Sequence, residues 1–238
     1  QLAFSGGNDK LRYAVTGNRS NQEGITKNSS FERNSIRVNL DADLTDKLTI
    51  GNSLTVSRVF DSRVGVNTAR QATSDGVVIQ ALVFQPTKPV FDEEGNYSIS
   101  EPFFDPLSNP VAKTLEPTRD DKTTRALGNV FAEYALSEHF SLKVSGGVDL
   151  LYNKNNYYEP RTTFVGAGAG GIARVNTLTS TLWQNENTLS YKNTFGDRHA
   201  INAVVGYTQQ GFAEEALNTR SEGFINDKLP YEALPDLN

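Results

Sequence analysis

The stretch that decides the fold is "FERNSIRVNLDADLTDKLTIGNSLTVSRVF", residues 31–60. From Ile36 to Ala42 an apolar side chain occupies every second position, and polar or charged side chains occupy the positions between. The segment "DLTDK" then supplies a polar turn, and the alternation resumes at Leu48. A period of two residues is typical of a β-strand with one apolar and one polar face. Two such strands joined by a short polar turn predict a β-hairpin.

The same design recurs along the chain. Alternating segments flank the turn "SEH" within 126–152 and the turn "KNTFGDRH" within about 177–208, and a partial hairpin with a turn at residues 6–9 opens the chain. The connections between these hairpins are predicted at 23–30, 61–122, 155–172 and from 212 onward. Short turns therefore alternate with longer loops, which in an up-and-down antiparallel sheet places all turns at one rim and all loops at the other.

Composition narrows the class of protein. The 238 residues fit one large domain or two small ones. No run of about 18 apolar residues occurs, which excludes a helical membrane span, whereas a membrane barrel has no high average hydropathy. The chain has no Cys, which removes disulfides, thiolate nucleophiles and Cys-based zinc sites. It has no Met and no signal segment at Gln1, so we expect an internal piece of a longer protein. Its net charge of -5 argues against a nucleic-acid partner.

Two β architectures fit this pattern, a soluble sandwich and a transmembrane barrel. The predicted strands run to about ten residues, near the length that a tilted strand needs to cross a bilayer. Charged residues on the polar face would be costly in a dry sandwich core and are suited to a watery lumen; they are Arg33, Arg37, Asp41, Lys143 and Asp149. Aromatic residues gather near the predicted strand ends, where interfacial girdles lie; they are Phe31, Phe60, Tyr134, Phe140, Tyr152, Tyr157, Tyr158, Tyr191, Phe195, Tyr207 and Phe212. We therefore predict an all-β, antiparallel up-and-down transmembrane β-barrel. About eight strands form either a small closed barrel or an arc of a larger one.

No catalytic, metal or cofactor site is predicted. The two histidines, His139 and His199, are far apart in sequence and are interpreted as solvated turn residues. "DEEGNY" at 92–97 lacks the ligand spacing of a calcium loop. "VGAGAGG" at 165–171 lacks the endings of phosphate- and dinucleotide-binding loops and is interpreted as a flexible loop tip.

The connection at 61–122 is long enough to have structure or a function of its own. Val77, Val78, Ala81 and Leu82 are spaced as on a short amphipathic helix. Two interpretations stay open: a packed lid over the barrel rim, or a contact with a partner or ligand through Tyr97, Phe103 and Phe104.

Several motifs resemble the SusC/RagA family of TonB-linked outer-membrane proteins. The segment from "LAFSGGNDKLRYAVTG" through "FERNSIRVNLDADL" is similar to the family's early barrel strands, and "ALVFQPTKPVFDEEGNYS", "ENTLSYKNTFGDRHAINAVVGYTQQ" and "GFINDKLPYEAL" resemble later segments in the same order. The matches cover nearly the whole chain. The resemblance implies an arc of a twenty-two-stranded barrel with long extracellular loops. The family's plug domain and TonB-contacting segment are not among these residues.

This resemblance predicts that residues 1–238 are part of an outer-membrane importer, not an enzyme. It implies a SusD-like lipoprotein lid, TonB as the source of force, and oligosaccharide or peptide substrates. The lumen-facing Arg33, Arg37, Asp41, Lys143 and Asp149 would contact plug or substrate, and the apolar face would contact outer-membrane lipid. The alternative is a self-contained soluble or surface β-domain that binds ligand by its loops.

Overall fold

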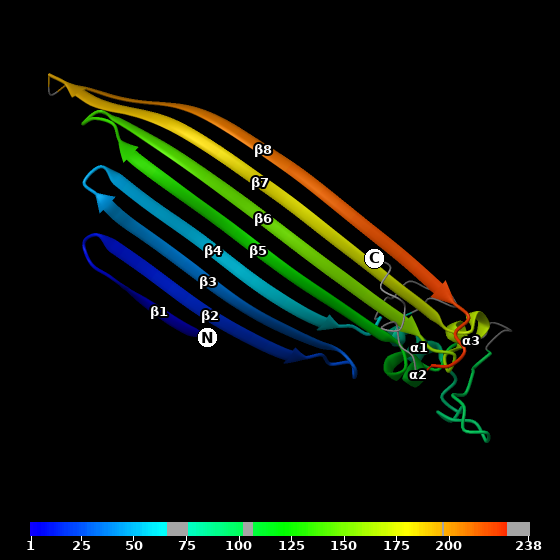
Figure 1. The fold of residues 1–238 in the computed structure, drawn as a ribbon. Coiled ribbons are helices and arrows are strands. Elements are labelled where there is room, and N and C mark those ends of the chain that lie inside the picture. Colours follow the sequence, from blue (N-terminus) through cyan, green and yellow to red (C-terminus); the bar gives the residue numbers. More distant parts are fainter. Residues whose placement is uncertain (66–75, 102–106, 197, 228–238) are drawn as a thin grey trace.

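A computed structural model describes residues 1–65, 76–101, 107–196 and 198–227. They form one antiparallel sheet in which eight strands lie in sequence order, each paired with the next (Figure 1). The strands are β1 (Leu2–Gly7), β2 (Leu11–Glu23), β3 (Ser30–Thr45), β4 (Leu48–Ser62), β5 (Thr118–Ala135), β6 (Phe140–Glu159), β7 (Ile172–Phe195) and β8 (His199–Glu222). The predicted up-and-down topology is confirmed.

The two rims of the sheet differ as the alternation of turns and loops predicted. Tight turns join β1 to β2, β3 to β4, β5 to β6 and β7 to β8 at one rim (Figure 1). The longer connections meet at the other rim and carry the helices α1 (Val77–Val83), α2 (Pro110–Leu115) and α3 (Phe164–Ala169). We refer to these as the turn rim and the loop rim. No helix in the described part of the chain is long and apolar enough to cross a membrane.

The strands are staggered from one hairpin to the next. Leu11, the first residue of β2, pairs with Ala42, and β3 then continues to Thr45 before its own turn. Phe140, the first residue of β6, pairs with Tyr191, and β7 likewise continues beyond it. Each later hairpin therefore reaches further along the strand direction. A stagger of this kind tilts the strands relative to the axis of a barrel, as closure of a sheet requires.

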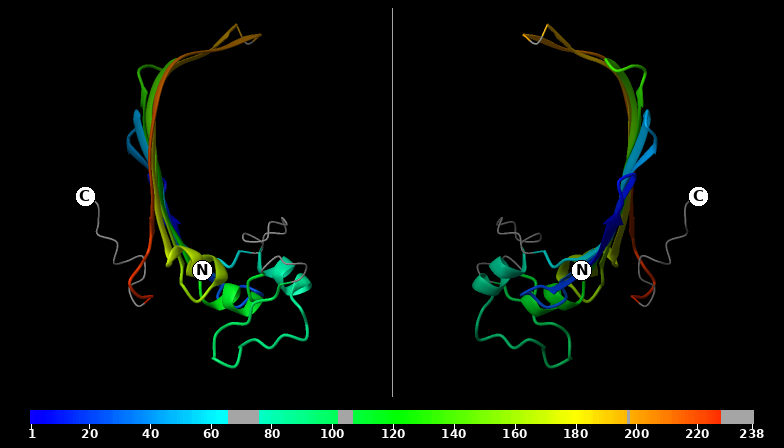
Figure 2. Two further views of the ribbon diagram at one scale, coloured as in Figure 1. Left: turned by 90° about the vertical axis from the view of Figure 1, so that its right-hand side faces the viewer. Right: turned by 90° about the vertical axis from the view of Figure 1, so that its left-hand side faces the viewer.

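The sheet is curved, and its two faces have different chemistry. Helices α1 and α2 lie on the concave side (Figure 2). Arg63, at the start of this connection, forms ion pairs with Asp61 and Asp121, which oppose each other on β4 and β5. Residues directly opposite on neighbouring strands share a face. The register thus places the charged and polar set of β3, which includes Arg37, on the concave face together with Asp61.

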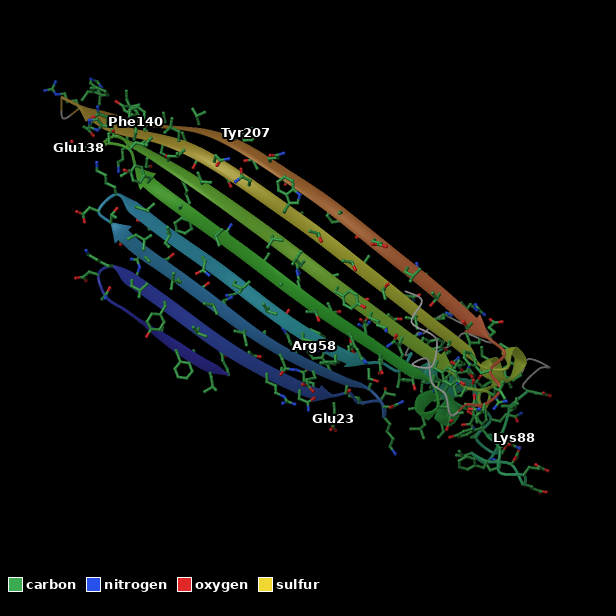
Figure 3. The ribbon with its side chains drawn as sticks, in the orientation of Figure 1. Glu23, Arg58, Lys88, Glu138, Phe140 and Tyr207 are labelled. Carbon is green, nitrogen blue, oxygen red and sulfur yellow. The ribbon has the colours of Figure 1, made fainter. Side chains whose placement is uncertain are left out.

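An apolar band runs along the convex face beside the turn rim. It includes Ile36 to Leu44 on β3 and Leu48 to Val56 on β4, nine residues in each strand counted inclusively. It continues over β5 from Ala126 to Tyr134 and over β6 from Phe140 to Leu150. Tilted strands cross a bilayer with about 9–11 residues. Most side chains of the convex band are exposed or half-buried, since the described residues form only one sheet and no second layer packs on it (Figure 3). A sandwich would bury this band.

Most buried side chains of the described residues lie at the loop rim, and Ala42 near the turn rim is the exception among the apolar ones. Tyr158 and Ala173 form a small apolar cluster, against which Val175 and Phe224 pack. Tyr158 and Phe224 meet edge to face, with 5.6 Å between ring centroids. The segment that follows β8 therefore lies on the convex side of the loop rim, as Figure 2 shows.

Some predicted boundaries are wrong because the strands are longer than the apolar alternation that marks them. The charged run before residue 126 is already strand, since β5 begins at Thr118. The loop expected from residue 212 is also strand, since β8 ends at Glu222. Strand β6 likewise continues to Glu159. These outer parts have polar residues on both faces, so the period of two is invisible in them.

Two local predictions also need correction. The glycine-rich stretch at 165–171, expected to be a flexible tip, lies largely within α3, which ends at Gly170 in the left-handed conformation (φ 69°). The expected aromatic girdle is incomplete, because the register places Phe31, Tyr157 and Phe212 on the concave face. The helix predicted near Val77 is confirmed as α1, but its buried side chain is Gln80, whereas Leu82 is exposed.

Candidate functional site

The candidate site is the concave face, where a shallow hollow of about 340 Å³ lies in the middle of the sheet. Small side chains create the space: Ser53, Gly147 and Ser145 line it from β4 and β6. Its other lining residues include Arg37, Thr55, Asn129, Asp149, Gln184 and Glu186. The hollow thus offers cations, carboxylates, amides and hydroxyls on one wall. A polar ligand or protein segment can form hydrogen bonds with these groups.

A second hollow of about 360 Å³ adjoins the first and shares Asn129, Ser145 and Glu186 with it. Lys143 lines this second hollow, with its Nζ 4.4 Å from the centroid of the Phe131 ring. The cation–π contact holds the ammonium group against the wall. Lys143 therefore presents a fixed positive charge toward the concave side.

The strongest ion pair of the concave face joins Arg125 on β5 to Asp149 on β6. Arg125 Nε donates to Asp149 Oδ1 at 2.8 Å, and Nη2 donates to the other carboxylate oxygen. A bidentate pair of this kind fixes both side chains. The Arg37 guanidinium is held differently, by donation from Nε to Thr55 Oγ1 at 3.1 Å. Arg37 therefore keeps most of its donors free toward the hollow.

The structure brings together some of the predicted site residues. Arg37 and Asp149 line the same hollow, and Lys143 lines the adjoining one. Arg33 and Asp41 share the concave face but line neither hollow, because Arg33 lies toward the loop rim and Asp41 toward the turn rim.

Of the three residues predicted for loop contact, the structure describes Tyr97 alone. Tyr97 is half-buried and directs its hydroxyl at Glu116 Oε1, 2.8 Å away, so its polar group is used inside the connection. Burial and this hydrogen bond raise the pKa of Tyr97 above its usual value, which keeps the hydroxyl a donor. Phe103 and Phe104 lie outside the described residues.

Polar contacts hold the connection between β4 and β5 together and join it to the neighbouring connections at the loop rim. Asn109, at the start of α2, accepts from Val111 N with its side-chain oxygen and donates its amide nitrogen to Val90 O and Ser98 O. Glu116 accepts from Thr162 of the next connection at 3.0 Å. The loop between β2 and β3 reaches the same place, since Asn28 donates to Thr114 O at 3.4 Å. These contacts favour the interpretation of a packed lid at the rim.

Sequence reasoning missed several residues of the concave face. Arg125, Asn129 and Phe131 were overlooked, although Arg125 stands at an even spacing from Asp121 within the strand that begins at Thr118. The sequence signal that could have found these residues is the strand alternation of β5, which extends back into the charged run before residue 126. Gln184 and Glu186 were overlooked because both faces of β7 are polar in "WQNEN", so no apolar partner marks the face.

The histidines and carboxylates of the described residues do not gather into a metal site. Within residues 1–65, 76–101, 107–196 and 198–227 no group of three or more His, Asp or Glu side chains is placed to hold a metal ion. His139 and His199 both lie at the turn rim, away from the hollows.

A curved sheet with an apolar convex band and a polar concave face is a section of barrel wall. No family model matches the chain. Two TonB-dependent receptors of Formosa agariphila, P3 and P26, are each 30% identical to it over 98% of its length. The matched region is 23% of each receptor, so the chain spans about a quarter of the length of the curated relatives that it matches.

The solved structures agree on the fold. The RagAB peptide transporter superposes with a TM-score of 0.79 at 20% identity, covering 96% of this chain and 26% of the matched chain. The RagAB peptide importer in its closed-closed state gives a TM-score of 0.78 at the same identity. The resemblance predicted from the motifs is confirmed: the chain is related over nearly its whole length to TonB-dependent receptors.

Proposed function

We propose that the chain forms part of the barrel wall of a SusC-like, TonB-dependent importer in a bacterial outer membrane. The observation that carries this proposal is the pairing of the two faces. A nine-residue apolar band matches the length of a tilted membrane strand, and a charged face with two hollows lies directly behind it. Apolar surface toward lipid and polar surface toward a lumen is the pattern of outer-membrane barrels.

The difference between the two rims supports an orientation of the wall in the membrane. Outer-membrane barrels have short periplasmic turns and longer extracellular loops. The turn rim would therefore face the periplasm, and the connection at 61–122 would lie outside the cell. Strands β7 and β8, each of 24 residues, are much longer than the apolar band and would extend beyond the bilayer.

The concave face would hold a plug domain supplied by the rest of the protein. Arg33, Arg37, Asp41, Lys143 and Asp149 would contact this plug or the passing substrate. Hydrogen bonds between charged side chains and a protein backbone are about twice as strong as neutral ones. They would keep the plug seated until TonB, driven by the inner-membrane proton gradient, pulls on it.

The loop rim would meet a SusD-like lipoprotein that captures the substrate. The matched RagAB structure is named a peptide transporter, which supports an oligomeric nutrient as the cargo, either peptide or oligosaccharide. Tyr97, Phe103 and Phe104 would contact the lipoprotein or the substrate at this rim. The internal hydrogen bond of Tyr97 suits a role in shaping the connection.

Thiol accessibility in outer membranes tests the wall. The chain contains no Cys, so single cysteines can be introduced into the whole receptor after any others are replaced. Leu40→Cys and Val130→Cys lie on the convex face, and Asn39→Cys and Ser53→Cys lie on the concave face. We expect a water-soluble maleimide to label only the concave pair, fully so after a denaturant removes the plug. Equal labelling of the convex pair would contradict the proposal.

Energised uptake tests the transport activity. Cells that contain the whole receptor are supplied with fluorescent oligopeptides or oligosaccharides, with and without a protonophore. Accumulation of one substrate class that stops when the proton gradient collapses supports import. Uptake of both classes that is independent of the gradient and of the receptor would contradict it.

A further inference from the structure

Three cationic side chains gather on the convex face just beyond the apolar band, on the side of the loop rim. They are Arg58 on β4, Lys122 on β5 and Lys154 on β6. Arg58 follows Val56, the last apolar residue of the band on β4, and Figure 3 shows it near the loop end of that strand. We call these three residues the convex basic cluster.

The register brings the three charges together. Phe60 is directly opposite Lys122, and Lys122 is directly opposite Lys154. The Arg58 guanidinium lies over the Phe60 ring, with 4.7 Å from Cζ to the centroid. Directly opposed side chains have Cβ atoms about 5 Å apart. One small anionic group can therefore contact more than one member of the cluster.

The described residues do not neutralise this cluster. None of Arg58, Lys122 and Lys154 forms an ion pair within residues 1–65, 76–101, 107–196 and 198–227. Glu32, on the same face, is already engaged by Arg19 at 3.4 Å. Asp120 is on the same face of β5 as Lys122, two residues closer to the loop rim and therefore further from the apolar band.

Two lysines directly opposite each other repel, which destabilises the strand pair unless an anion lies between them. Lys122 and Lys154 are both half-buried, so water screens their charges less than those of fully exposed lysines. The arrangement therefore favours binding of an anion at this position.

We propose that the convex basic cluster binds the phosphate groups of a phosphorylated lipid headgroup in the outer leaflet. The position decides the ligand, because the cluster stands where the apolar band ends and an acyl chain on the band would place its headgroup there. Tyr152, exposed between Leu150 and Lys154, has the amphipathic ring that membrane interfaces favour. This inference rests on the proposed function, since it needs the convex face to be in a membrane.

Native mass spectrometry of the whole detergent-solubilised receptor tests the inference. The probes are bisphosphorylated lipid A, dephosphorylated lipid A, phosphatidylethanolamine and inorganic phosphate. We expect bisphosphorylated lipid A to be retained best. Each basic residue near a charged lipid surface contributes roughly fivefold in affinity, so Lys122→Gln with Lys154→Gln should weaken binding about 25-fold.

The matched control is Lys88→Gln, which removes one charge at the same rim from the exposed connection between β4 and β5 (Figure 3). It should leave lipid binding unchanged, while Arg58→Gln should weaken it about fivefold. Equal loss in the control, equal retention of dephosphorylated lipid A, or binding of inorganic phosphate alone would overturn the inference. If thiol labelling still shows a protected convex face, the proposed function survives such a result. If the convex face is labelled, both fail.

Discussion

The wall and the loop rim of this molecule use apolar side chains in opposite ways. In the convex band Ile36 and Val130 are 58% and 59% exposed, whereas Ala173 and Ile172 at the loop rim are 0% and 4% exposed. The band therefore takes its apolar contacts from outside the chain, and the rim takes its contacts from within. A substitution should be tolerated or rejected in each region according to the solvent that surrounds it.

The largest effect is expected from a charge placed in the convex band. Leu40→Arg should destabilise the folded wall by about 2–4 kcal/mol, the cost of Arg near the bilayer midplane of a barrel. Asn39→Arg, one residue away on the polar concave face, should have a much smaller effect because its side chain does not enter lipid. Folded receptor is measured in outer membranes by its altered gel mobility without heating. Equal losses for the two variants would mean that the faces do not differ in solvent.

At the loop rim a single added methyl group should also destabilise the fold, here by a steric clash inside the protein. A Cβ on Gly166 would lie 1.9 Å from the backbone oxygen of Pro160, so Gly166→Ala forces the backbone to move. We expect local destabilisation of about 1–3 kcal/mol, the usual range for overpacking. Gly168→Ala is the control in the same helix, since nothing lies within 4 Å of its Cβ position. Hydrogen exchange of residues 160–171 should accelerate in the first variant alone.

A polar side chain at the rim allows a graded test of the lid. Asn109→Ala removes the cap of α2, takes the side-chain donor away from Ser98 O, and leaves Val90 O with the Ser98 amide as its donor, a loss of about 1–3 kcal/mol. Asn109→Ser keeps a capping oxygen but loses both donations, so its loss should be smaller. Protease cleavage within the connection is the measurement. The order Ala, Ser, wild type in decreasing susceptibility is expected, and equal susceptibility of the three proteins would show that the cap is irrelevant.

The same contrast between wall and rim explains what sequence could predict. The band was predictable because Ile36, Val38 and Leu40 alternate with polar residues, and one period of two fixes the face of each. Arg37 and Asp149 followed from that alternation. Arg125 did not, because its part of β5 has polar residues on both faces and resembles a solvated approach.

The rim could not be predicted from local pattern because its contacts join distant segments. The Tyr158 ring packs on Phe224, which lies beyond the end of β8 and far from it in sequence. In α1 the buried side chain is Gln80, whereas the helical spacing had favoured Val78 and Leu82. Long-range packing of this kind carries no period in the sequence. The family resemblance predicted the order of segments but not these side-chain contacts.

The smallest effect is a pH dependence at the junction after β8. Asp227 accepts from the Tyr158 hydroxyl at 2.7 Å and pairs with Arg161 at 3.1 Å. Burial opposes the charge of Asp227, but these hydrogen bonds outweigh it and lower the pKa of its carboxyl below the usual 3.8. Burial and the same contact raise the pKa of Tyr158 to about 12, so the hydroxyl remains a donor at neutral pH.

A depressed carboxyl pKa means that the folded junction binds fewer protons than the detached one. Its attachment is therefore fully stable above about pH 4 and weakens as the pH falls through the lowered pKa of Asp227. The amides of Gly223 and Phe224, which donate to Ala169 O and Gly170 O, report the attachment through their protection from hydrogen exchange. Protection should therefore hold at pH 5 and fall below about pH 4. In Asp227→Asn it should be lower at pH 5 and independent of pH, because the amide can still accept from Tyr158 but has no charge to lose. A variant that kept the pH dependence of the wild type would assign the titration to another group.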